Sequence, residues 1–416
     1  MNDYGRFFST NAGTMRESAI RQMGAVLAQV PDIVSFAPGY PAEDEFPWRA
    51  CADVAAELLK GADGSVLQYG PTRGYKPLRE VIAGLMAQRT VAASVDRLLV
   101  TSGSQQGLDL LARVLLDPGD VALVELPSYT GAITAFRNVG ASLVGVRQDD
   151  DGIDFDHLAH VWTTLRHEGR RVKFIYVVPN FQNPSGSLLP LERRRRLLEW
   201  ARAHDVLVIE DDPYRDLYFS NVPGPESTRP IAADDDEGRV IYLSSFSKTL
   251  APGFRVAWIS GPEPVLAKIE LAKQAADLCT GGLDQRIVHE ACRRGVLDAQ
   301  LPRLRAHYER KCDVMSAALG RRLADSVRWV RPRGGFFLWL ELREPLRSET
   351  LLSVARAHGV IFVMGSAFFV NGEGHRHLRL SFSAPAPDRI ELGIERLGAA
   401  VTAASSEAVQ GVESIS

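Results

Sequence analysis

The sequence predicts an α/β protein with a mostly parallel sheet in a large domain and a second, smaller α+β domain. Short apolar runs bounded by turn residues occur at 97–101, 121–126, 173–178, 206–210, 240–244 and 255–259. Helical patterns such as 104–116 and 191–203 separate them. Continuous apolar runs of this length are typical of strands buried on both faces of a parallel sheet. After about residue 325 the apolar runs become shorter and alternate with helical patterns near 349–358 and 386–400, which indicates the second domain.

We expect four parts along the chain. Residues 1–48 form an N-terminal amphipathic helix, at 16–30, and a proline-rich arm. Residues 49–320 form the large domain, and 321–401 form the small domain, against which the arm packs. Residues 402–416 are small and polar without periodicity, which predicts a disordered tail.

Composition excludes several classes of protein. The net charge of −3 provides no general positive field, so we expect neither a nucleic-acid partner nor binding to an anionic membrane. No apolar stretch reaches membrane-spanning length, and the N-terminus lacks a signal pattern, so a cytoplasmic protein is expected. The four cysteines form no C-x-x-C pair, which argues against a disulfide framework and against a metal site.

Polar residues follow several predicted strands, at the edge where ligands bind in open α/β sheets. Residues 102–107 open a helix with small side chains, which suits a phosphate, although a plain helix cap is the alternative. Residues 210–214 place Asp211, Asp212 and Tyr214 after one strand, and 179–186 place Asn183 after another. Taken singly, residues 210–214 are explained by an acidic surface turn, and residues 179–186 by an Asx/Pro turn.

Lys248 follows the apolar run 240–244 and is flanked by Ser245 and Ser247. A lone lysine is usually solvated. A lysine after a buried strand differs, because a desolvated amine loses its proton easily and is the nucleophile that carbonyl cofactors require. The arginine run at 193–196 lies on an amphipathic helix instead, and we interpret it as a solvated face.

The motifs taken together resemble a known family. The order N-P-x-G at 183–186, D-x-x-Y at 211–214 and S-x-S-K at 245–248, with Arg255 seven residues later, resembles the fold type I enzymes that depend on pyridoxal 5′-phosphate (PLP), from about residue 16 to 395. The segments at 69–74, 101–106 and 378–383 are similar to 2-aminoadipate, kynurenine and aromatic aminotransferases. The resemblance implies an aminotransferase of class EC 2.6.1, a homodimer with shared active sites, and ping-pong transfer between an L-amino acid and a 2-oxo acid such as 2-oxoglutarate.

The resemblance also implies roles in the reaction. Lys248 carries PLP as a Schiff base and moves the proton between the substrate and the cofactor. Asp211 pairs with the pyridinium nitrogen, whereas Asp212 is less suited, because D-x-x-Y pairs Asp211 with Tyr214. Asn183 and Tyr214 bind the phenolic oxygen.

Further cofactor contacts are implied by the same resemblance. Tyr129 stacks on the ring. Tyr69 reaches the phosphate of the neighbouring subunit. The remaining cofactor-binding residues, most of them around the phosphate, are Ser104, Gln105, Ser245, Ser247 and Arg255.

Arg379 is the expected clamp for the substrate α-carboxylate. It alternates with apolar residues in the strand 377–383, and without the resemblance a surface arginine is an equal alternative. The resemblance places Asn183, Gly39, Tyr40 and Arg21 at the substrate as well. Tyr40 follows a single Gly39 where many relatives carry paired glycines, and no counterpart exists of the side-chain arginine of aspartate aminotransferases.

Two other functions stay open at this point. The same cofactor and fold support β-elimination, decarboxylation and cyclisation, because a fold does not determine the reaction. A more distant alternative is an amino-acid-sensing domain of a transcription regulator.

Overall fold

The computed structural model describes residues 4–15 and 32–413. Its large domain contains an eight-stranded sheet. In order across the sheet, the strands are β2 (Leu98–Thr101), β9 (Ala257–Ser260), β8 (Val240–Ser245), β7 (Leu207–Asp211), β6 (Val172–Val177), β3 (Val121–Leu126), β4 (Ser142–Asp149) and β5 (Gly152–Ile153). The neighbours from β8 to β4 are parallel, and β9 is antiparallel to both β8 and β2. The carboxyl ends of β2, β3, β6, β7 and β8 therefore share one edge.

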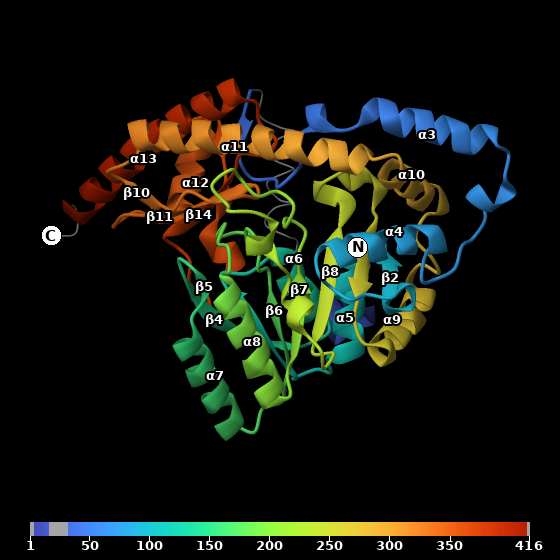
Figure 1. Cartoon of the computed structure of the whole chain (residues 1–416). Helices are drawn as coiled ribbons and strands as arrows, with labels where there is room; N and C mark the ends of the chain where they lie inside the picture. The colour runs from blue at the N-terminus through green and yellow to red at the C-terminus, as the bar shows by residue number, and fades with distance from the viewer. Residues whose placement is uncertain (1–3, 16–31, 414–416) are drawn as a thin grey trace.

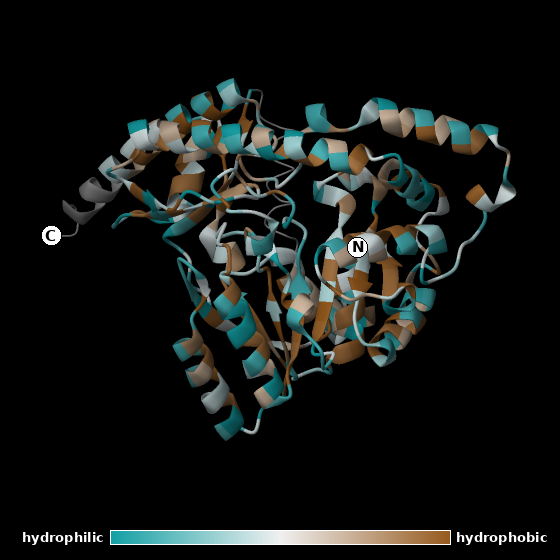
Figure 2. Cartoon of the chain, viewed as in Figure 1, coloured by the Kyte–Doolittle hydropathy of each residue, from teal (hydrophilic) through white to brown (hydrophobic). Residues whose placement is uncertain are grey.

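Helices cover both faces of this sheet, as Figure 1 shows. On one face lie α4 (Lys76–Gln88), α7 (Phe155–His167), α8 (Leu191–His204) and α10 (Gly282–Arg293), and on the other lie α5 (Ser104–Leu115), α6 (Thr130–Asn138) and α9 (Glu263–Ala276). Apolar residues concentrate on the strands and on the helix faces that meet them (Figure 2). The predicted α/β architecture is confirmed. Strand β4 was not predicted, because Gly145, Arg147 and Gln148 interrupt its apolar pattern.

The small domain is built on a four-stranded antiparallel sheet. Its order is β10 (Val327–Trp329), β11 (Phe337–Leu342), β14 (His377–Ser381) and β13 (Val363–Met364). Helices α12 (Ser348–Ala357) and α13 (Pro387–Glu413) complete it. The long helix α11 (Val296–Arg322) runs from the large domain to the small one and packs on α13 (Figure 1).

The expected disordered tail at 402–416 differs from the structure, because α13 continues to Glu413. Val401 and Ala404 are buried, and the hydroxyls of Thr402 and Ser405 donate to the carbonyls of Gly398 and Val401 at 3.1 and 2.8 Å. Small residues such as alanine do not oppose a helix that an amphipathic segment has already nucleated. The prediction of disorder is therefore wrong for residues 402–413.

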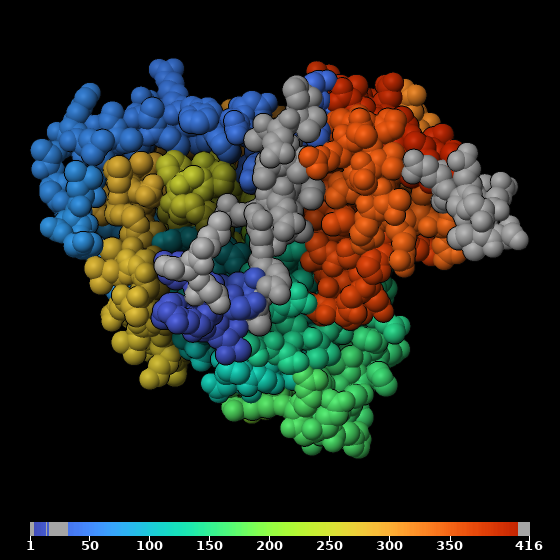
Figure 3. Space-filling model, turned by 180° about the vertical axis from the view of Figure 1, so that it is seen from behind, coloured from blue at the N-terminus to red at the C-terminus, as the bar shows by residue number. Residues whose placement is uncertain are grey.

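The N-terminal arm joins the small domain. Strand β1 (Val34–Ser35) pairs in parallel with β12 (Val360–Ile361), and the amide of Ser381 donates to the carbonyl of Phe36 at 2.8 Å. Helix α3 (Trp48–Lys60) then packs on α10. The predicted helix at 16–30 lies outside the described residues, whereas α1 (Thr10–Thr14) packs on α6 at the surface seen in Figure 3.

Within residues 4–15 and 32–413, no helix combines the length and the apolar content that crossing a bilayer requires. The cytoplasmic location and the domain limits stay predictions.

Candidate active site

Lys248 lies at the carboxyl edge of the sheet, at the end of the short helix η7 (Phe246–Lys248) that follows β8. The hydroxyl of Ser245 accepts the amide of Ser247 at 2.9 Å and so caps this turn. The Lys248 Nζ donates to the carbonyl of Gly39, in the arm, at 3.0 Å. Burial, together with the positive charges of Arg379 and Arg255, lowers the pKa of this amine to about 8, and the charge of Asp211 opposes that fall. An amine with this pKa is partly neutral near pH 7 and can act as a nucleophile or a base.

Asp211 ends β7 and presents one free carboxylate oxygen. The hydroxyl of Tyr176, in β6, donates to Oδ2 at 2.8 Å. Oδ1 is buried and has no hydrogen-bond partner among the residues that the structure describes. Burial raises the pKa of Asp211 to about 7, and the hydrogen bond from Tyr176 and the charge of Lys248 oppose that rise. A buried acceptor without a partner is costly unless a ligand pairs with it.

Asp212 lies on the opposite face of the sheet, and both its oxygens are occupied. Asn180 Nδ2 donates to Oδ1 at 2.8 Å, and the hydroxyl of Tyr242, in β8, donates to Oδ2 at 2.9 Å. The geometry therefore supports Asp211 as the carboxylate available to a ligand.

Arg194 belongs to the same buried network, which corrects the interpretation of the run 193–196 as a solvated face. Its side chain is only 2% exposed and donates to Asn180 Oδ1 at 2.8 Å and to the carbonyl of Leu189 at 2.8 Å. An arginine satisfied by carbonyls can be buried on an otherwise solvated helix.

Arg379 is buried between the two domains. It is 1% exposed, which excludes the surface alternative. Its Nη1 donates to Asn183 Oδ1 at 2.7 Å, and its Nη2 donates to the carbonyl of Ala37. Nε is buried without a hydrogen-bond partner in the described part of the chain. Burial lowers the pKa of this guanidinium to about 10, which still leaves it charged at neutral pH. A buried cation with an unused donor suits a carboxylate ligand.

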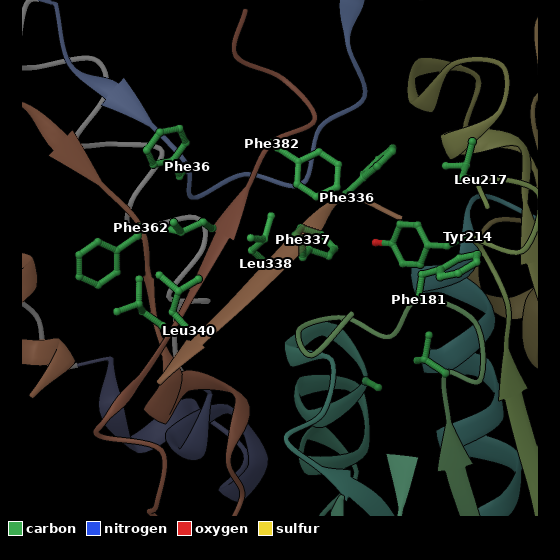
Figure 4. Close-up of a cluster of buried hydrophobic side chains, with 14 of the residues drawn as sticks. Phe36, Phe181, Tyr214, Leu217, Phe336, Phe337, Leu338, Leu340, Phe362 and Phe382 are labelled. Atoms are coloured by element: carbon green, nitrogen blue, oxygen red, sulfur yellow. The ribbon is translucent and has the colours of Figure 1, made fainter. Parts of the chain in front are cut away.

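Aromatic side chains form the wall between Arg379 and Tyr214. Phe337 lies under the Arg379 guanidinium at 4.2 Å, and Phe336 and Phe337 meet the Tyr214 ring at centroid distances of 5.5 and 5.9 Å. Figure 4 shows the Tyr214 hydroxyl pointing toward the small-domain strands. Burial raises the pKa of Tyr214, so this phenol keeps its proton and can donate a hydrogen bond. Tyr214 and Phe336 also lie beside the Lys248 amine, at 6.0 and 5.6 Å from Nζ to their ring centroids.

The start of α5 forms a cradle with Arg255. Gly103 precedes the helix with φ +86°, and a Cβ there would lie 2.1 Å from Arg255 Nη2. Arg255 itself has a left-handed φ of +52°, a strained conformation that is typical of functional sites. The Ser104 hydroxyl oxygen is buried and has no partner within the described ranges. Gln105 is exposed and donates to the carbonyl of Gly131 at 2.9 Å. A hydroxyl, a guanidinium and a helix N-terminus are the usual ligands of a phosphate.

Tyr129 follows β3 and immediately precedes α6. Burial and the charge of Asp211 raise the pKa of its phenol, and the charges of Arg379 and Arg255 oppose that rise. A Cβ on Gly131 would approach the Tyr129 ring to 2.5 Å, so a glycine at 131 leaves room for this ring position.

For three of the predicted site residues, the structure does not show a side chain beside Lys248. Tyr69 is 79% exposed and Tyr40 is 62% exposed. The Tyr40 carbonyl accepts from the Ser383 hydroxyl at 2.7 Å, so its backbone is held beside the site while its ring faces outward. Arg21 lies outside the described residues.

Sequence reasoning missed two positions that shape the site. The sequence shows Tyr176 only as part of an apolar strand. In the sheet Tyr176 lies opposite Ile209, and residues two apart in a strand share a face, so Tyr176 projects from the same face as Asp211. Glu125, near the end of β3, accepts from the amide of Val178 at 2.9 Å and from Gln148 Nε2 at 2.7 Å. Burial raises the pKa of Glu125 to about 7. A polar residue near the end of an apolar strand was the available signal in both cases.

The chain matches the family described as aminotransferase class I and II over residues 31–397. It is 40% identical over 396 residues to aromatic-amino-acid aminotransferase 1 of Thermococcus litoralis, covering 95% of this chain and 94% of that protein.

Two solved structures are similar over nearly the whole chain. The kynurenine aminotransferase of Pyrococcus horikoshii in complex with PMP has a TM-score of 0.91 at 38% identity, covering 96% of this chain and 98% of that chain. LysN, the α-aminoadipate aminotransferase of Thermus thermophilus, was solved with N-(5′-phosphopyridoxyl)-L-leucine and has a TM-score of 0.88 at 39% identity, covering 97% of this chain and 100% of that chain. The predicted fold type I is confirmed.

The residues around Lys248 fit the cofactor of these relatives. Asp211 Oδ1 and Ser104 Oγ are both buried and lack partners among the described residues. The carboxylate oxygen can accept from a protonated ring nitrogen, and the hydroxyl can donate to a phosphate. Because the family, the fold and this donor set agree, the chain belongs to the class I and II aminotransferases and is a PLP-dependent enzyme that acts on amino acid and 2-oxo acid substrates.

Proposed function

We propose that Lys248 binds PLP covalently through Nζ and, when the incoming amino acid frees it, accepts the proton of the substrate α-carbon. PLP supplies the electron-withdrawing ring that makes this carbon acidic. The pKa of about 8 supports this role of Lys248, because an amine near neutrality both accepts and returns a proton at working pH. Asp211 keeps the ring nitrogen protonated through Oδ1, and Asn183 and Tyr214 hold the phenolic oxygen.

The cradle formed by the start of α5 and Arg255 supports the other proposed cofactor contacts. Ser104, Arg255 and the first backbone amides of α5 bind the phosphate, and Tyr129 lies on the ring face. Gln105, Ser245 and Ser247 complete the polar surroundings, since the Ser245 and Ser247 hydroxyls lie 2.8 Å apart beside Lys248.

Arg379 binds the substrate α-carboxylate, supported by Asn183 and by the backbone of Gly39. The substrates that we propose are aromatic L-amino acids, kynurenine or 2-aminoadipate, with 2-oxoglutarate as the acceptor. The names of the relatives support this class. Tyr40 and Arg21 are the residues that we place nearest the substrate side chain.

One observation supports the assignment most strongly. Three polar side-chain atoms, Asp211 Oδ1, Ser104 Oγ and Arg379 Nε, are buried in the large-domain and small-domain walls without a hydrogen-bond partner in the described chain. Folding that leaves three such atoms unpaired costs several kcal/mol in total, about 1–3 kcal/mol each, unless ligands pair with them. A cofactor ring, a phosphate and a carboxylate satisfy one atom each.

A half-reaction tests the function. The PLP-loaded enzyme is mixed with single amino acids, without an acceptor, and loss of the visible absorbance of the bound cofactor is followed. Aromatic amino acids, kynurenine or 2-aminoadipate are expected to bleach the absorbance and to leave a stable pyridoxamine form that 2-oxoglutarate reverses. Release of ammonia or carbon dioxide instead would contradict amino transfer between these substrates.

We propose further that two copies share their active sites, with Tyr69 reaching the phosphate of the partner subunit. Tyr69 and its neighbour Leu67 are exposed apolar side chains at 79% and 75%, which a second copy would cover.

Subunit mixing tests this arrangement. Lys248→Ala and Tyr69→Ala proteins are denatured together and refolded. If Tyr69 acts across the interface, mixed dimers contain one site with both native residues, so activity returns to about a quarter of the wild-type value. No gain over the separate proteins would contradict the shared site.

A further inference from the structure

The Asp211 carboxylate is held from behind by Tyr176, the hydroxyl of which donates to Oδ2 at 2.8 Å. We propose that Tyr176 is a positioning residue for the reaction, which holds Asp211 so that Oδ1 faces the ring nitrogen of the cofactor. This inference rests on the proposed role of Asp211.

The sheet makes the contact rigid. Strands β6 and β7 are parallel, with Tyr176 opposite Ile209, so Tyr176 and Asp211 project from the same face. Both residues are buried. The Tyr176 ring also meets Phe136 of α6 edge-on at a centroid distance of 5.6 Å, which prevents the phenol from moving away.

The hydrogen bond selects one orientation of the carboxylate. Without it, Oδ2 is a second buried oxygen lacking a partner, and rotation of the side chain exchanges the two oxygens freely. With it, Oδ2 is occupied and Oδ1 is the one oxygen left for a ligand.

The bond also supports the charge that the ring nitrogen requires. The charged and titratable groups around Asp211 are Tyr176, Lys248, Tyr129 and Tyr214, and its neighbour Asp212 lies on the other face of the sheet. Burial favours the neutral acid, whereas donation from Tyr176 favours the carboxylate. A carboxylate, rather than a neutral acid, stabilises a protonated ring.

The chain contains a matched control on the other face of the same sheet. The Tyr242 hydroxyl donates to Asp212 Oδ2 at 2.9 Å and also accepts from Arg89 Nη1 at 2.7 Å. Tyr176→Phe and Tyr242→Phe therefore each remove one buried phenol-to-carboxylate bond and keep the ring.

The experiment compares Tyr176→Phe, Tyr242→Phe and Asp211→Asn. For each protein we measure the PLP dissociation constant, the 15N chemical shift of the ring nitrogen of bound labelled PLP, the single-turnover rate with an amino donor, and the melting temperature. Tyr176→Phe is expected to weaken PLP binding and to slow the single turnover, each by about ten- to a hundredfold, because a hydrogen bond to a charged group is lost. The 15N shift is expected to move toward the unprotonated value.

Tyr242→Phe is expected to lower the melting temperature as Tyr176→Phe does, while PLP affinity, 15N shift and rate stay within about twofold of wild type. If the two tyrosine variants behave alike in all four measurements, Tyr176 has only a structural role and the inference is wrong. If Asp211→Asn abolishes the 15N shift of the protonated ring but Tyr176→Phe leaves it unchanged, the role of Asp211 stands and that of Tyr176 fails. If Asp211→Asn has no effect either, the proposed role of Asp211 fails first.

Discussion

Asp211 and Asp212 are adjacent in the sequence, but their side chains lie on opposite faces of the sheet and differ in their hydrogen-bond partners. Each accepts a phenol hydroxyl from a neighbouring strand, at 2.8 Å from Tyr176 and at 2.9 Å from Tyr242. Among the residues that the structure describes, none bonds to Asp211 Oδ1, on the face that carries Lys248, whereas Asn180 occupies the second oxygen of Asp212. The difference teaches that an unsatisfied atom, rather than a residue type, distinguishes a ligand site from a structural network.

The network around Asp212 continues away from the site. Asn180 also accepts from Arg194, and Arg89, which donates to Tyr242, pairs with Asp216 at 2.7 Å. Buried groups of this kind are stable only when each is satisfied, so removing one partner costs folding free energy. Asp212 therefore belongs to a satisfied structural network on the face of the sheet opposite Lys248.

The largest expected effect comes from removing the amine on the Asp211 face. Lys248→Ala is expected to bind PLP only without a covalent bond and to lose about four orders of magnitude or more in turnover, because nucleophile and base disappear together. Borohydride reduction and peptide mapping of the wild-type enzyme check the attachment site. Lys273 serves as the control, since its side chain is fully buried but its amine is paired with Asp277 at 2.7 Å. A label on Lys273 would overturn the assignment.

The direct comparison is Asp211→Asn against Asp212→Asn. Asp211→Asn is expected to keep the fold and to slow the half-reaction about a thousandfold, because a neutral amide no longer favours the protonated ring. Asp212→Asn is expected to change that rate by less than about threefold and to lower the free energy of unfolding by about 1–3 kcal/mol. Stopped-flow absorbance and chemical denaturation measure the two quantities. Equal rates for the two variants would show that the faces do not differ in function.

The pH dependence of cofactor capture sharpens the comparison. Only the neutral amine attacks PLP, so the capture rate of the cofactor-free protein is expected to rise about tenfold per pH unit and to level off near pH 8, the lowered pKa of Lys248. The Asp211 charge raises this pKa, so Asp211→Asn is expected to move the profile to lower pH. Asp212→Asn serves as the control and leaves the midpoint in place. A wild-type midpoint near 10 would contradict the lowered pKa.

The smallest effect is expected where neither carboxylate is involved. Arg21→Ala is expected to raise the KM for 2-oxoglutarate or 2-aminoadipate by about tenfold, because one charge-assisted contact to the acidic side chain is lost. The kcat and the constants for aromatic donors should stay nearly unchanged. Steady-state kinetics with both donor classes measure this. Equal effects on both classes would place Arg21 away from the substrate side chain.

The sequence predicted the parallel sheet well because its strands are buried on both faces and therefore almost wholly apolar, as in β3 and β6. It could not predict β4, which is only partly covered, or the burial of Arg194 within an arginine run. The order of the motifs predicted Lys248 and Asp211 as site residues, because the chemistry of a ligand site restricts which residue types can follow the strands. The role of Tyr176 could not be seen, since strand pairing across 35 residues, which no local pattern encodes, brings it to Asp211.

The arm that enters the site has a consequence for how the enzyme is made. Three backbone carbonyls of the arm accept hydrogen bonds from distant side chains: Ala37 from Arg379, Gly39 from Lys248 and Tyr40 from Ser383. These donors lie between 209 and 343 residues further along the chain. During synthesis the arm leaves the ribosome among the first segments, while β14 leaves among the last. Lys248 lies between β8 and β9 and is therefore made together with the large-domain sheet, whereas Arg379 and Ser383 are made later. The arm can thus gain its contacts with Arg379 and Ser383 only in a late closing event, after the large-domain sheet has formed.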